Sequence, residues 1–164
     1  MKPEAIVYTS STGHTARYAA MLGKAASLPV YSMEDSLSAL PKGTHILYMG
    51  WLLASNVAGY RKASKHHHIL AVCGVGLCPT GELLKEVRKT TRIPDETALF
   101  TLQGGMDKEK MPKLHRKMID FLTRFMQKKK NPTPGDQAML ALLVQGGDYV
   151  QESNLAAVLN WLQE

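Results

Sequence analysis

The chain has 164 residues, of which 45% are hydrophobic and 21% charged, and its 20 Lys and Arg against 14 Asp and Glu give a net charge of +6. This length favours one domain, residues 1–164, and the composition is that of an ordinary globular protein. No apolar run approaches the roughly 20 residues that a spanning helix requires, and no signal peptide is expected. These properties exclude a membrane-spanning protein.

A hydroxyl-rich turn near the N-terminus is the first candidate site. Residues 5–8 form a short apolar run that predicts a buried strand, and a helix is expected from about Gly13 to Ala26. Between them lies the stretch Ser10-Ser11-Thr12-Gly13-His14-Thr15. Helix N-termini bind anions through unpaired N–H groups, and a glycine lets the backbone approach the anion. We predict a phosphate monoester site here; the alternative is an ordinary N-cap loop, which needs only one hydroxyl.

The next part of the chain alternates between expected strands and helices. Further strands are expected at 29–32, 45–49, 69–73 and 98–102, with helical segments at 35–40, 56–65 and 80–91. In the last of these, Leu83, Leu84 and Val87 form the predicted buried stripe. Ser153 is expected to cap a final helix with the stripe Leu155, Val158, Leu159 and Leu162. Such alternation is typical of an α/β protein with a parallel sheet covered on both faces.

The stretch Ser10, Thr12, Gly13 and Thr15 matches the pattern Thr/Ser-x-Thr-Gly-x-Thr, which resembles the FMN phosphate loop of the flavodoxin family. The resemblance implies a doubly wound five-stranded parallel sheet in the order 2-1-3-4-5 and a cytoplasmic flavoprotein that carries electrons. It implies FMN-binding residues in three loops at the carboxyl ends of the strands. These are Ser10, Ser11, Thr12, Gly13, His14 and Thr15 after the first strand, Gly50, Trp51 and Leu52 after the third, and Gly74, Val75 and Gly76 after the fourth.

A basic segment accounts for the positive charge of the chain. Residues 108–130 hold nine Lys and Arg against two acids, whereas the remainder has a net charge of −1. Within the segment an apolar stripe at helical spacing predicts an extra basic helix inserted after the fifth strand; it consists of Leu114, Met118, Phe121, Leu122 and Phe125. Two interpretations remain open. The helix lies on an anionic membrane surface, or it is solvated and its stripe packs on the protein's own core.

The layout of this insertion resembles the flavodoxin-like menaquinone-dependent protoporphyrinogen dehydrogenases. Three functions are therefore carried forward. The first is an FMN-binding electron-transfer protein with a redox partner protein. The second is an oxidoreductase that passes electrons from a porphyrinogen to a quinone, with the protein peripheral to the membrane. The third is an interaction module that no longer binds FMN. Nucleic-acid binding is not favoured, because no base-stacking platform accompanies the lysines.

No catalytic acid, base or metal ligand is nominated from the sequence. No Ser-His-Asp set, metal cluster or carboxylate pair is evident, and His14 is expected to face solvent. The run His66-His67-His68 is a poor chelate, because consecutive side chains point in different directions. Cys73 and Cys78 fit no common zinc or redox spacing and are interpreted as reduced thiols. Whether the chain is an enzyme is left open.

Overall fold

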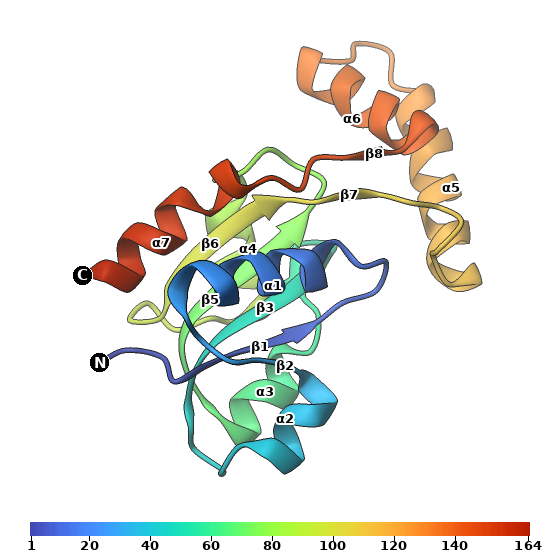
Figure 1. Cartoon of the computed structure of the whole chain (residues 1–164). Coiled ribbons are helices and arrows are strands. Elements are labelled where there is room, and N and C mark those ends of the chain that lie inside the picture. Colours follow the sequence, from blue (N-terminus) through green and yellow to red (C-terminus); the bar gives the residue numbers. More distant parts are fainter.

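The computed structural model describes all residues, 1–164. Strands and helices alternate along the chain until two long helices, Lys113–Gln127 and Pro134–Gln145, follow one another before the C-terminal helix (Figure 1). The strands are β1 (Ala5–Thr9), β2 (Val30–Ser32), β3 (His45–Leu53), β4 (Asn56–Val57), β5 (His68–Gly76), β6 (Ala98–Gln103), β7 (Gly105–Met106) and β8 (Gly147–Asp148). The helices are α1 (His14–Ala26), α2 (Met33–Ala39), α3 (Tyr60–His66), α4 (Leu84–Thr91), α5 (Lys113–Gln127), α6 (Pro134–Gln145), the 3₁₀ turn η1 (Glu152–Leu155) and α7 (Ala156–Gln163).

The central sheet is mostly parallel and runs in the order β2-β1-β3-β5-β6. The expected α/β class is confirmed, but the strand count differs from five, because β4 pairs antiparallel with the end of β3. A separate two-stranded ribbon joins β7 to β8. The parallel strands bring all their carboxyl ends to one edge of the sheet, which is where ligands bind in open α/β sheets.

Helices cover both faces of the sheet. Leu47 and Met49 of β3 point to the face covered by α1 and α7, whereas Ile46 and Tyr48 point to the face covered by α2, α3 and α4. Figure 1 shows these two helical layers on either side of the strands. The central strands are therefore buried on both sides, which explains why they read as continuous apolar runs.

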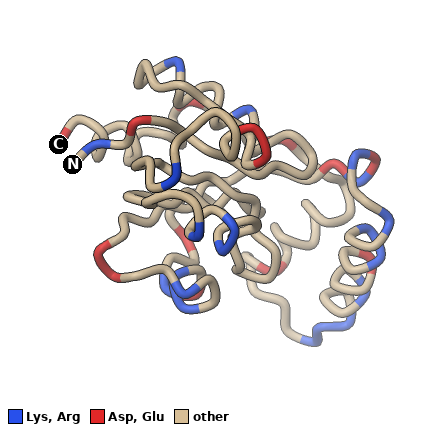
Figure 2. The backbone as a smooth tube through the Cα atoms, turned by 90° about the horizontal axis from the view of Figure 1, so that it is seen from below, with Lys and Arg blue, Asp and Glu red and all other residues tan.

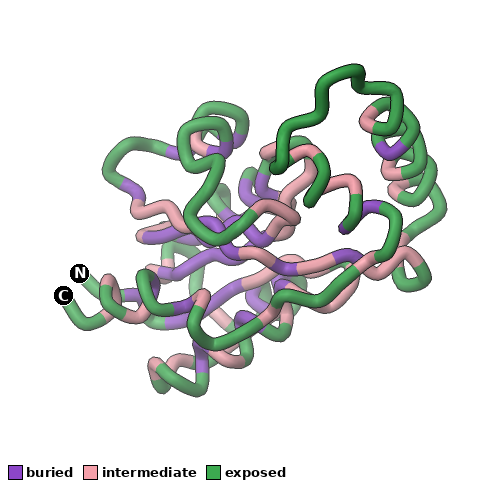
Figure 3. Tube along the Cα trace, turned by 90° about the horizontal axis from the view of Figure 1, so that it is seen from above, coloured by how far each residue is buried: buried purple, intermediate pink, exposed green.

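The helices α5 and α6 form a small projection beyond the sheet edge. The projection joins the rest of the fold through the β7–β8 ribbon, and its own core holds Met106, Leu142 and Leu143. Figure 3 shows that the outer turns of both helices are mainly exposed. The expected basic helix after the last parallel strand is present as α5. No helix of the chain combines the length and the hydrophobicity needed to cross a bilayer.

Four predicted boundaries were wrong, each for a local reason. Strands β3 and β5 continue to Leu53 and Gly76, because β3 keeps pairing with β5 and turns back into β4. The helix expected at 56–65 is therefore β4 followed by α3. Helix α4 starts only at Leu84, because Leu83 has a left-handed backbone, and both leucines are exposed. The C-terminal stripe is confirmed: Leu155 and Val158 are buried, and Leu159 and Leu162 pack against them.

His67 is a buried histidine at the amino end of β5. Its Nε2 lies 3.1 Å from the Ser36 hydroxyl, which donates to the Met33 carbonyl, so Nε2–H is the donor of the pair. Its Nδ1 is buried and has no hydrogen-bond partner. Burial lowers the pKa of His67, and the neighbouring His66 lowers it further. The folded protein therefore favours the neutral ring.

We predict that His67 makes the fold less stable in mild acid. The unfolded chain takes up the proton near pH 6.5 more readily than the folded chain, so the free energy of unfolding falls as the pH drops below that value. His67→Gln keeps a donor near Ser36 and should flatten this dependence in denaturant titrations between pH 7 and pH 5. His68→Gln, an exposed neighbour, is the control. Equal pH dependence of all three proteins would contradict the assignment.

Candidate functional site

The turn between β1 and α1 presents unpaired backbone donors. Gly13 has φ +101° and provides the left-handed reversal that starts α1 only four residues after β1 ends. The N–H groups of Ser11, Thr12 and Gly13 donate to no acceptor in the protein. The Ser10 hydroxyl accepts from the N–H of Ala16 at 3.3 Å, which fixes the turn against the first turn of the helix. Three consecutive amides are thus left for a ligand.

Two hydroxyls of the same turn are also free. Thr15 is only 1% exposed and Ser11 is exposed, and neither side chain makes a hydrogen bond within the protein, although both line a pocket. The Thr15 hydroxyl is open to the pocket, because His67 Nδ1 is the one buried side-chain polar atom without a hydrogen-bond partner. The Thr12 hydroxyl differs, because it pairs with His14 Nδ1 at 2.9 Å. The pocket wall therefore offers two hydroxyls beside the three amides.

The pocket lies at the carboxyl edge of the sheet and has walls from three parts of the fold. Its cavity volume is about 110 Å³. One wall is the turn after β1, and the floor is the end of β3 and β5. The roof is α5 with the segment before it. The lining residues that were not among the predicted site residues are Leu53, Leu77, Gly105, Met106, Met111, His115, Met118 and Ile119.

Most of the predicted site residues meet at this pocket. Ser10, Ser11, Thr12, His14, Thr15, Trp51, Leu52, Val75 and Gly76 line it. Gly13 lines an adjoining polar groove, and Gly50 and Gly74 lie opposite each other in the sheet without lining the pocket. The residues 50–52 and 74–76 were expected in loops, but they belong to β3 and β5. The roof residues were not predicted as part of the site, because the segment that holds them was expected to form a separate, inserted helix.

The floor of the pocket is shaped by Leu52 and two glycines. A Cβ at Gly74 or Gly76 would lie 2.8 or 2.9 Å from the Leu52 side chain, so the glycines leave room for that leucine. Trp51 points the other way from the strand and meets His115 of α5, with the ring centroids 5.0 Å apart. Through this contact, α5 in the roof of the pocket touches the end of β3 in its floor.

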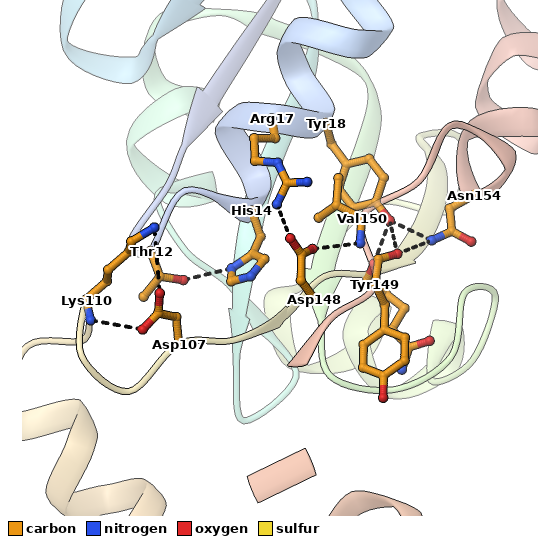
Figure 4. A network of polar contacts seen from close by, with 11 residues as sticks. Thr12, His14, Arg17, Tyr18, Asp107, Lys110, Asp148, Tyr149, Val150 and Asn154 are labelled. Atoms are coloured by element: carbon orange, nitrogen blue, oxygen red, sulfur yellow. Dashed lines mark hydrogen bonds and ion pairs between the residues drawn. The ribbon is translucent and has the colours of Figure 1, made fainter. Parts of the chain in front are cut away.

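A polar network joins the turn to the base of the projection (Figure 4). Arg17 of α1 forms an ion pair with Asp148 of β8, and Asp148 also accepts from the N–H of Val150 at 3.0 Å. Figure 4 shows His14 between this pair and Thr12. The expectation that His14 faces solvent was wrong, because the histidine is half-buried and lines both the pocket and the adjoining groove.

The surroundings of His14 favour its neutral form. Burial lowers the pKa of His14, and the charge of Asp148 opposes that effect only in part. The cations close to the turn are already engaged: Arg17 pairs with Asp148, and Lys110 pairs with Asp107 at 3.6 Å. An anion at the turn would therefore be held mainly by neutral amides and hydroxyls, as at other helix N-termini.

Comparison with known proteins gives no relative for this chain: no protein-family model, no curated protein and no solved structure matches it.

We predict that Gly105 is required for the ribbon that carries the roof. A Cβ at this position would lie 2.3 Å from the Gly147 carbonyl oxygen and 2.8 Å from His14 Nε2. Gly105→Ala should lower the free energy of unfolding by about 1–3 kcal/mol in denaturant titrations, because the overpacked backbone has to move.

The matched control is Gly135→Ala at the start of α6, where the nearest atom to the added Cβ is 3.7 Å away. This substitution should be neutral or stabilising by up to about 1 kcal/mol, because alanine loses less entropy in a helix. Similar effects of the two substitutions would contradict the close packing of the ribbon.

Proposed function

We propose that the chain is a flavodoxin-like protein that binds FMN at the pocket and transfers electrons. The observation that carries the proposal is the combination of free donors and an apolar pocket at one edge of a parallel sheet. Ser11 and Thr12, whose amides are unpaired, and the hydroxyl-bearing Thr15 line the pocket. Gly13, with the third unpaired amide, lies in the adjoining groove. Apolar side chains of β3, β5 and α5 line the rest. An amphiphilic anion with a phosphate and a flat ring matches this division.

The phosphate of FMN fits the turn. A phosphate monoester accepts several hydrogen bonds, and the turn provides three consecutive amides together with the start of the α1 dipole. The hydroxyls of Ser11 and Thr15, which bond to no other group of the protein, add two further donors. These neutral groups would hold the monoester close to the backbone. Arg17 would not take part, because it already forms an ion pair with Asp148.

The apolar lining of the pocket supports binding of the flavin ring there. Trp51 and Val75 are neighbours across β3 and β5, and both line the pocket beneath α5. When bound, FMN would supply the group that accepts and releases electrons. The residues of the chain orient the ring: Trp51 offers an aromatic face, and the methionines of the roof exclude water.

The apolar roof favours the oxidoreductase of the sequence analysis as a second candidate. Met111, Met118 and Ile119 leave an apolar approach to the ring, which suits a quinone acceptor or the apolar macrocycle of a porphyrinogen donor. The third candidate, an interaction module without FMN, is favoured by the contact between Trp51 and His115. In that case the protein's own side chains occupy the place of the ring.

We predict that the chain binds FMN more tightly than riboflavin, because only FMN carries the phosphate. The double variant Ser11→Ala/Thr15→Val should weaken FMN binding by at least tenfold and leave riboflavin binding nearly unchanged. The loss follows from removing two donors to a charged group, each worth about 1.5–3 kcal/mol. Quenching of flavin fluorescence during titration measures both affinities.

The matched control is Ser38→Ala/Thr44→Val, which removes two hydroxyls far along the chain from the turn, each bonded only to a local carbonyl. It should retain the preference for FMN. If neither flavin is quenched, the chain is not a flavoprotein and the interaction module is favoured. If both flavins bind equally, the turn does not hold the phosphate.

A further inference from the structure

Helix α5 has two apolar faces, and only one of them packs inside the protein. Ile119 and Met126 pack against the small core of the projection, and Thr123 is buried on the same side. The stripe lies on the neighbouring side of the helix and is exposed; it consists of Leu114, Met118, Phe121, Leu122 and Phe125. Leu114, Phe121 and Phe125 retain 76%, 72% and 67% of their accessible surface. The interpretation that this stripe packs on the protein's own core is therefore wrong.

Free cations follow one edge of the exposed stripe. On a helix, Lys113, Lys117 and Arg124 project side by side, next to Phe121 and Leu114. None of the three forms an ion pair, and Lys128 at the end of the helix is also unpaired. Figure 2 shows this concentration of Lys and Arg along the outer helix. The outer side of α5 thus presents an aromatic stripe beside a row of exposed, unpaired cations.

We propose that α5 docks the protein on the surface of an anionic phospholipid bilayer. A helix of 15 residues is about 22 Å long and can lie flat in the interface. Its two phenylalanines and Leu114 would enter the acyl boundary, and the lysine and arginine row would meet the lipid phosphates. Charge complementarity selects this occupant, because the edge of the stripe carries unpaired positive charge and Asp120, the acid of the helix, already pairs with Lys108.

A second copy of the chain fits the same face less well. A two-fold pairing of α5 with its antiparallel copy would place the Lys117 and Arg124 edge of one helix against the same edge of the other. Like charges would then face each other across the apolar contact. A lipid surface instead neutralises this edge while it covers the stripe.

Docking through this face would place the pocket beside the lipid. Met118 belongs both to the exposed stripe and to the pocket roof. His115, three residues earlier on the same helix, also lines the pocket. Only this consequence rests on the proposed function; the docking itself depends on α5 alone. Loss of FMN binding and loss of lipid binding can therefore be observed separately.

Flotation of the full-length protein with vesicles tests the proposal. Vesicles of phosphatidylcholine with 30% phosphatidylglycerol should bind the protein at least tenfold more tightly than vesicles of phosphatidylcholine alone, and added salt should weaken the binding. Phe121→Ser/Phe125→Ser and Lys117→Gln/Arg124→Gln should each reduce it about tenfold or more. All four side chains are exposed, so circular dichroism should show an unchanged fold.

The matched controls are Leu37→Ser, an exposed apolar residue of α2, and Lys24→Gln/Lys89→Gln, two exposed cations outside α5. Both should bind vesicles like the unmodified chain. Equal binding to the two kinds of vesicle, or no effect of the α5 substitutions, would overturn the proposal. A dimer in light scattering that Phe121→Ser/Phe125→Ser abolishes would also overturn it, because a second copy would then cover the stripe.

Discussion

The left-handed backbone at Gly13 is the constraint on which the candidate site depends. It lets the chain pass from a buried strand to a helix within four residues, and it leaves the amides of Ser11, Thr12 and Gly13 without partners. The parallel sheet then brings the ends of β3 and β5 to the same edge, so that an apolar floor adjoins these polar donors. The division of the pocket into a polar and an apolar end follows from these two features together.

Helix α5 links the pocket to the outer surface. Its inner side closes the pocket with His115 and Ile119, together with Met111 just before the helix, while its outer side exposes two phenylalanines beside unpaired cations. The projection is joined to the rest of the fold by the β7–β8 ribbon, by the ion pair of Arg17 with Asp148 and by the contact of Trp51 with His115. An exposed ion pair contributes little free energy. The close packing of the ribbon around Gly105 therefore contributes more than the ion pair to holding the roof in place.

The sequence predicts the parts of this fold that depend on short-range pattern. The buried strands, the start of α1 and the C-terminal stripe follow from apolar runs and helical periodicity. The ends of β3 and β5 could not be predicted, because Gly74 and Gly76 read as loop residues, whereas in the fold they make room for the side chain of Leu52. Periodicity also detects the outer stripe of α5 but cannot say which face packs, since His115 and Ile119 form a second stripe on the same helix. The pairing of Trp51 with His115 joins residues 64 positions apart and has no local signal.

The most direct test of the account is the response of individual backbone amides to flavin, observed in ¹H–¹⁵N correlation spectra. We expect FMN to shift the amides of residues 11–15 most strongly, because the phosphate would accept from them, and we expect riboflavin to leave them nearly unchanged while both flavins shift Trp51 and Val75. Amides of 11–15 that do not respond to FMN, or that respond equally to riboflavin, would contradict the central claim that this turn binds a phosphate.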